Sequence, residues 1–212
     1  MSQGWKKPES QLLLLALMVG VLIYLGVSPS ASAAGPQDRI REILDAVSAV
    51  LDDPQLRGPD KEAERKQQVR RIIHESFEFE DMAREALGAQ WAGLTPQQRE
   101  EFVSLFGDLF ERSYNRLVLK FLAGRKTSYG KESIEQERAV VQTTLVVPKT
   151  EEKLPIDYRL IEKRQRWTVF DVVVDGVSIA GNYRAQFEKI LRTSSYETLV
   201  QKIKSKLDKE PS

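Results

Sequence analysis

Four segments with a two-residue hydrophobic period, joined by short polar connections, constrain this fold most. They span residues 126–134, 137–147, 155–162 and 166–175. Alternating apolar residues predict strands whose side chains lie alternately on two faces. The polar connections between these segments are too short to contain a crossover helix, so consecutive strands must pair antiparallel. We therefore expect a strongly twisted antiparallel sheet of about four strands.

Helical patterns flank this predicted sheet on both sides in the sequence. Apolar residues recur at three- and four-residue spacing over 40–51, 60–77, 79–87, 95–124, 183–191 and 199–207. Thr95 and Gln98 predict a capping box at the start of the long fourth helix, and Ser194 with Glu197 predicts another near the C-terminus. The order of helices, antiparallel sheet and helices is that of an α+β domain.

The first 33 residues have the features of an export signal. Lys6 and Lys7 precede an uncharged apolar run, Leu12–Leu25, and Ala31-Ser32-Ala33 fits the small-x-small rule of signal peptidase. We expect cleavage before Ala34. The alternative is an uncleaved inner-membrane anchor, for which the apolar stretch is somewhat shorter than the ~20 residues of a spanning helix.

The remainder, residues 34–212, is expected to form a single domain. Its predicted parts are a mainly helical segment over 34–124, an antiparallel sheet over 125–176 and C-terminal helices over 177–212. The chain has no cysteine, so an exported domain of this kind must be held together by its core instead of by disulfides.

Composition argues against several classes of function. The formal net charge of +1 resides in the leader, so residues 34–212 are neutral overall and give no electrostatic footprint for nucleic acid. One histidine and no cysteine cannot build a usual zinc site. No calcium-loop spacing and no phosphate-cradling glycine loop are present. We expect no metal, no cofactor and no nucleic-acid partner.

Gly176-Val177-Ser178-Ile179-Ala180 lies one residue short of the Gly-x-Ser-x-Gly nucleophile motif. That motif belongs to a mostly parallel sheet and needs a histidine, whereas the only histidine is His74, far upstream. We interpret Gly176 as a turn residue and Ser178 as the cap of the following helix.

Acid–base catalysis by a carboxylate in an apolar pocket, as in a pocket enzyme of the isomerase type, is a second chemical hypothesis. Asp157, Asp171 and Asp175 are its candidates, although the alternation favours a solvated strand face. In the same strand Phe170, Val172 and Val174 share one face, opposite Val169 and Val173, and we expect the first face to point inward. Together with the aromatic long helix, this face predicts either ordinary core or a cavity for an apolar ligand.

Two segments resemble the periplasmic phospholipid-binding proteins of the MlaC type, also called toluene-tolerance proteins. They are LGAQWAGLTPQQREEFVSLFGDLFERSYNRLVLKF at 87–121 and WTVFDVVVDGVSIAGNYRAQFEKIL at 167–191. The first is similar to that family's Leu-Gly, Trp, Leu-Thr and Phe-Phe-Leu-Tyr pattern, and the second to its Asp-Gly-Val-Ser and Asn-Tyr-Arg block. Phe170 replaces a commoner tyrosine. The likeness covers nearly all of 36–208.

The resemblance implies a periplasmic phospholipid carrier without catalytic activity, whose acyl tails lie in an apolar pocket. It implies exchange of diacyl phospholipid with an inner-membrane ABC transporter complex containing an MCE-domain ring. It also implies exchange with an outer-membrane lipoprotein–porin complex, which maintains outer-membrane lipid asymmetry. We expect a monomer. A hopanoid-associated lipid-binding paralogue of the same family is the alternative within this class.

We expect the pocket to be lined from three parts of the chain: the long helix, the sheet and the segment after the turn. The predicted lining residues are Phe106, Phe110, Tyr114, Leu117, Val140, Leu145, Tyr158, Leu160, Phe170, Val172, Val174, Val177 and Tyr183. Arg184 is a candidate for a phosphate contact at the mouth, against the simpler expectation of a helix-surface ion pair.

Overall fold

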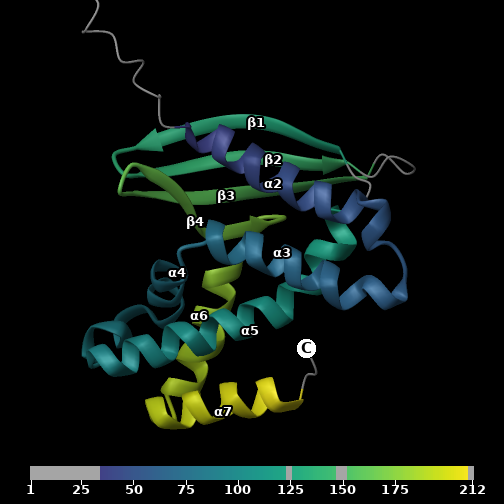
Figure 1. Ribbon diagram of the computed structural model, residues 1–212. Coiled ribbons are helices and arrows are strands. Elements are labelled where there is room, and N and C mark those ends of the chain that lie inside the picture. The colour runs from purple at the N-terminus through teal and green to yellow at the C-terminus, as the bar shows by residue number, and fades with distance from the viewer. Residues whose placement is uncertain (1–33, 123–125, 147–151, 210–212) are drawn as a thin grey trace, which may run out of the picture. The chain divides into compact units, whose positions relative to one another are not determined.

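An antiparallel sheet with strand order β1-β2-β3-β4-β5 forms one layer of the fold (Figure 1). Its strands are β1 (Lys126–Glu135), β2 (Arg138–Val146), β3 (Lys153–Lys163), β4 (Arg166–Val174) and β5 (Val177–Ser178). The four long strands confirm the prediction from the two-residue period. The two-residue β5 was not predicted, because two residues are too few to show a period.

The computed structural model describes residues 34–122, 126–146 and 152–209, with the side chains of helix α5 described as far as Ser113. Residues 34–212 form one compact unit. The predicted leader, residues 1–33, lies outside the described residues.

Tight turns connect β3 to β4 and β4 to β5. Arg164 and Gln165 have φ values of 52° and 61°, and Asp175 and Gly176 have φ values of 49° and 77°. Two consecutive residues with positive φ form the hairpin turn whose twist matches that of the flanking strands. The prediction that Gly176 is a turn residue is therefore confirmed.

Helices lie against one face of the sheet and continue past β4 on the side away from β1 (Figure 1). They are α2 (Pro36–Asp52), α3 (Glu62–Ser76), α4 (Phe79–Leu87), α5 (Pro96–Leu122), α6 (Ile179–Leu191) and α7 (Tyr196–Lys209), with short 3-10 segments η1 (Pro54–Leu56), η2 (Pro59–Lys61) and η3 (Gly88–Gly93). Helix α2 contacts β1, β2 and β4, whereas α4 and α6 contact β4. Helix α5 packs against α2, α3, α4 and α7.

Side-chain caps define where the helices begin. Thr95 and Gln98 form the predicted capping box of α5, because each side chain accepts a hydrogen bond from the other residue's backbone N–H at 3.2 and 3.0 Å. The predicted cap of the last helix was wrong by one residue. Ser195, not Ser194, precedes α7 and accepts from the backbone N–H of Thr198 at 3.3 Å.

The sheet has an inner face toward the helices and an outer face. We define the inner face by the buried residues Ala139, Val141, Leu145, Ile156, Tyr158, Leu160, Val169 and Val172. The outer face carries Arg138, Val140, Arg159, Ile161, Phe170 and Val173.

A bulge in β4 separates residues that strict alternation would put on one face. The register shifts so that Leu160 pairs with Val169 while Tyr158 pairs with Val172, which leaves Phe170 as the extra residue. The prediction that Phe170 shares the inner face with Val172 was therefore wrong, and Val169 takes the inward position instead. An inserted residue reverses the alternation on one side of a bulge.

The carboxylate of Asp171 joins the sheet to α6. Asp171 is 0% exposed and accepts hydrogen bonds from the Ser178 hydroxyl at 2.6 Å and from the backbone N–H of Ala180 at 3.0 Å. It also accepts from its neighbour Val172 N–H and from the Arg159 guanidinium at 3.1 Å. The expectation of a solvated carboxylate was wrong, because these donors replace water.

Ser178 completes this junction. While it donates to Asp171, its oxygen accepts from the backbone N–H of Gly181 at 2.9 Å, so it is the N-cap of α6. The predicted capping role is confirmed, and both hydrogen-bonding functions of the hydroxyl are used for structure.

We predict that D171N lowers the free energy of unfolding by about 2–4 kcal/mol, because the amide group faces donors that need an acceptor. Urea unfolding measures this. The matched control is D175N. Asp175 is exposed and has a positive φ, which asparagine tolerates, so the change should stay within about 0.5 kcal/mol. Equal effects of the two substitutions would contradict the junction's role.

Candidate functional site

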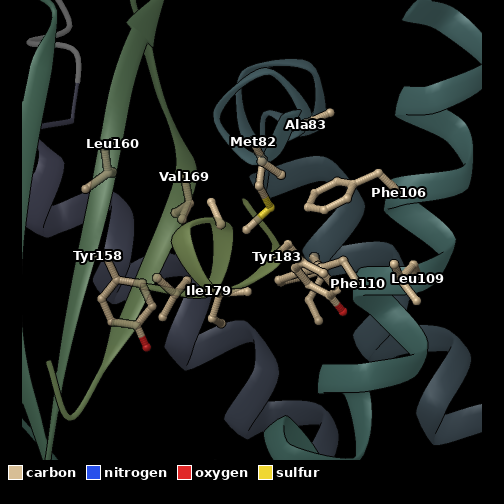
Figure 2. Close-up of a cluster of buried hydrophobic side chains, with 14 of the residues drawn as sticks. Met82, Ala83, Phe106, Leu109, Phe110, Tyr158, Leu160, Val169, Ile179 and Tyr183 are labelled. Atoms are coloured by element: carbon tan, nitrogen blue, oxygen red, sulfur yellow. The ribbon is translucent and has the colours of Figure 1, made fainter. Parts of the chain in front are cut away.

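A buried apolar cluster lies between the inner face and helices α4, α5 and α6 (Figure 2). From the sheet come Tyr158, Leu160 and Val169, from α5 come Phe106, Leu109 and Phe110, and Met82, Ile179 and Tyr183 lie between them. The Phe106 and Tyr183 ring centroids are 5.2 Å apart in an edge-on contact. This part of the interior is filled by the protein's own side chains.

The same apolar face is less completely covered at one end of the sheet, where β1 and β3 begin and β2 and β4 end. We call the inner-face residues there the strand-end patch: Tyr129, Leu145, Leu154, Tyr158 and Val174. Leu145 pairs directly with Leu154. Tyr129, Leu154 and Val174 are only half-buried. An apolar surface that the core leaves partly open can accept an apolar ligand.

Polar groups in the strand-end patch are few. The Thr143 hydroxyl beside it donates to the Ile156 carbonyl at 2.9 Å. Burial raises the pKa of Tyr158, and the nearby Tyr129 phenol adds to this shift. Burial also raises the pKa of Tyr129, where Asp45 adds to the shift and the Arg41 guanidinium opposes it. Both phenols are therefore uncharged at neutral pH.

The structure brings most of the predicted lining residues together. Phe106, Phe110, Leu145, Tyr158, Leu160, Val172 and Tyr183 are buried in the cluster between the inner face and the helices. Val174 packs at its edge. Tyr114 and Leu117 belong to the part of α5 whose side chains lie outside the described residues.

Three predicted lining residues lie elsewhere. Val140 and Phe170 are on the outer face, and Val177, in the two-residue β5, is 60% exposed. The outer face forms an open groove of about 370 Å³ that also contains Arg138, Arg159 and Glu135. The Arg138 guanidinium lies 4.7 Å from the Phe170 ring centroid. This mixed-charge groove has a different chemistry from the inner face.

We did not predict Tyr129, Leu154 and Ile179 from the sequence as residues of the apolar site. The first two occupy inward positions in predicted strands, so the two-residue period contained the signal. Ile179 follows the Ser178 cap, and its 6% exposure results from the direction in which α6 leaves the sheet. No local pattern in the chain indicates that direction.

The remaining candidates for chemistry have structural partners. His74 of α3 contacts the carboxylate of Glu111 of α5, which also receives the Arg70 Nε at 2.5 Å. Arg184 forms the helix-surface ion pair, with Glu188 at 3.0 Å. Within the described part of the chain, no group of three His, Cys, Asp or Glu side chains could hold a metal ion. No described helix is long and apolar enough to cross a membrane.

These features define an α+β protein in which helices and an antiparallel sheet surround an apolar interior. A sequence model of the family described as MlaC protein matches residues 41–205. The chain therefore belongs to the MlaC family, which confirms the family that the two sequence blocks indicated.

The fold is similar to that of a solved phospholipid-binding protein from Ralstonia solanacearum, determined in complex with a phospholipid at 1.53 Å resolution. The TM-score is 0.72 at 23% sequence identity, covering 83% of this chain and 98% of the other. This likeness confirms the α+β fold.

The Glu111 carboxylate predicts a pH dependence of stability. Its side chain is 5% exposed, and burial raises its pKa above the usual 4.5, although His74 and Arg70 oppose the shift. The folded protein thus binds this proton more readily than the unfolded chain does. The stability from this group is fully present below the unfolded pKa and is lost as the pH rises through the folded pKa.

In E111Q the group no longer titrates. We expect the free energy of unfolding of E111Q, relative to the wild type, to increase from about pH 4 to about pH 6. Urea unfolding of both proteins across this range provides the measurement. A difference that stays constant, or that falls with rising pH, would show that burial does not dominate at Glu111.

Proposed function

We propose that this protein is a non-catalytic carrier of diacyl phospholipid. The observation that carries the proposal is the phospholipid bound to the solved protein from Ralstonia solanacearum, whose fold this chain shares over 98% of that protein's length. Membership of the MlaC family and the partly open apolar strand-end patch support it.

The energetics of lipid transfer favour such a site. Each methylene removed from water contributes about 0.8 kcal/mol, so two acyl tails contribute on the order of 20 kcal/mol before ordering costs are subtracted. Free lipid crosses water slowly against this cost. A carrier must shelter the tails and still release them, which suits an apolar wall with few polar contacts.

We propose that the tails contact the strand-end patch and the adjoining inner face. The proposed wall consists of Leu145, Tyr158, Val172 and Val174 from the sheet. Phe106, Phe110, Leu160 and Tyr183, which lie in the filled part of the interior, are proposed as its closed end. Tyr114 and Leu117 remain proposed lining residues on α5. Val140 and Phe170 are not part of the proposed wall because they lie on the outer face, and Val177 is not because it is exposed.

We further propose that the carrier acts in the periplasm as a monomer, after export by the leader. Its proposed partners are an inner-membrane ABC transporter complex with an MCE-domain ring and an outer-membrane lipoprotein–porin complex. Such an exchange would maintain the lipid asymmetry of the outer membrane. The leader pattern in residues 1–33 and the family membership support this route.

Native mass spectrometry of the exported protein, purified without detergent, tests the proposal. We expect an added mass equal to one or more diacyl phospholipids, identified after organic extraction. An added polycyclic lipid would instead support the hopanoid-associated alternative. Protein that carries no lipid, and takes none up from phospholipid vesicles, would contradict the carrier.

A pair of matched substitutions locates the site. Val174 and Val140 are half-buried valines of β4 and β2 on the inner and outer faces. We expect V174W to reduce bound phospholipid about tenfold, as overpacking of ~1–3 kcal/mol implies, and V140W to leave it near the wild-type amount. Quantitative mass spectrometry of extracted lipid measures both. Equal losses, or a loss in V140W alone, would contradict an inner-face site.

A further inference from the structure

The phenol of Tyr158 lacks a hydrogen-bond partner within the described part of the chain. Its side chain is 8% exposed, and its ring packs in the apolar cluster of the inner face. The buried phenols of the helical layer differ. The Tyr183 hydroxyl donates to Ser113 Oγ at 3.0 Å, and the half-buried Tyr196 hydroxyl donates to the Gln98 carbonyl at 3.0 Å.

Such a position is unfavourable unless something else binds the hydroxyl. Buried tyrosine hydroxyls usually find a partner, and a phenylalanine would fill the same apolar space without an unpaired donor. Within the described part of the chain, Arg39 Nε and Arg99 Nε are fully enclosed side-chain polar atoms without a hydrogen-bond partner. The Tyr158 oxygen is not fully enclosed in this way, so water or a ligand atom can reach it.

The surroundings of Tyr158 become more polar toward the β1 side of the sheet. Tyr129 of β1 is close enough for its phenol to help raise the Tyr158 pKa, and it is half-buried. The Arg41 guanidinium of α2 is exposed and lies 4.3 Å from the Tyr129 ring centroid. The order is therefore an apolar wall, a phenol without a partner among the described residues, a half-buried phenol and an exposed Arg41 guanidinium, with the Asp45 carboxylate also near Tyr129.

A diacyl phospholipid has its groups in the same order. Hydrocarbon tails are followed by two ester carbonyls, which accept hydrogen bonds, and then by an anionic phosphate. A donor at the border of an apolar wall thus matches the ester level of the lipid. This inference rests on the proposed phospholipid carrier. It adds which protein atom and which lipid atom form a hydrogen bond.

We propose that the Tyr158 hydroxyl donates a hydrogen bond to an acyl-ester carbonyl oxygen of the bound lipid. Tyr158 is then the polar anchor that sets how deeply the tails enter, and it gives the protein a preference for ester-linked over ether-linked chains. The apolar wall by itself does not distinguish the two linkages, because both carry the same hydrocarbon.

The test compares two lipids and two proteins. A diester phosphatidylglycerol and a diether analogue of equal chain length differ at the carbonyl oxygens, which the diether lacks. We expect the delipidated wild type to bind the diester about fivefold more tightly, as one hydrogen bond implies. In Y158F that preference should vanish through weaker diester binding, while diether binding stays the same. Displacement of a fluorescent lipid gives the dissociation constants.

Thermal unfolding of the lipid-free proteins separates anchoring from a structural role. Y158F should melt at or above the wild-type temperature, since it removes an unpaired hydroxyl. The control Y196F breaks the hydrogen bond to Gln98, so it should melt lower and yet keep the diester preference. A lower melting temperature in Y158F with equal losses for both lipids would overturn the anchor.

The two proposals fail differently. If the wild type binds both lipids with equal affinity, the ester anchor is wrong and the carrier stands. If Y158F still binds the diester more tightly than the diether, the ester anchor is likewise wrong and the carrier stands. If the wild type binds neither lipid from vesicles or in displacement, the carrier itself is wrong.

Discussion

The buried carboxylate of Asp171 determines how the two layers of this protein meet. It lies in β4 and accepts hydrogen bonds from the Ala180 backbone N–H and the capping Ser178 hydroxyl of α6, which ties the start of the helix to the sheet. The direction of α6 carries Ile179 and Tyr183 into the interior, where Tyr183 meets Phe106. A buried charge with several donors is costly to disturb, which suits a junction that the rest of the packing depends on.

The apolar interior next to this junction is fully buried in one part and only half-buried in another. This difference in burial bears on the proposed function. Between the first part of α5 and the sheet lie fully buried large side chains such as Phe106 and Met82. At the strand-end patch the apolar face continues, but Tyr129, Leu154 and Val174 remain partly open. The proposed carrier needs both properties, because the filled part would give stability without disulfides and the partly open part would receive the lipid. The Tyr158 phenol, which has no hydrogen-bond partner in the described part of the chain, lies where these two parts meet.

Much of the candidate site could be predicted from the sequence. Leu145, Tyr158 and Leu160 were predicted as lining residues and lie on the inner face, and the helical period placed Phe106 and Phe110 on the buried side of α5. Val140 was predicted beside Leu145, although residues five apart in a regular strand lie on opposite faces. Phe170 could not be predicted. A bulge depends on which residue of β3 opposes which residue of β4, and the period within one strand contains no information about its partner. The burial of Asp171 was missed for a similar reason, since its donors come from a helix that folds back onto the strand.

The sequence by itself determined the order of elements, the antiparallel pairing, the helix start at Thr95 and the family, because each depends on residues that are close together in the chain. Only the tertiary structure decided which face of each strand is inside, that Asp171 is buried, and that the Tyr158 phenol has no hydrogen-bond partner among the described residues. These properties arise from contacts between distant segments, such as α2 with β1 and α6 with β4. The chemistry proposed for Tyr158 is of this second kind. A tyrosine in a strand pattern predicts burial, but whether its hydroxyl is satisfied depends on every element packed around it.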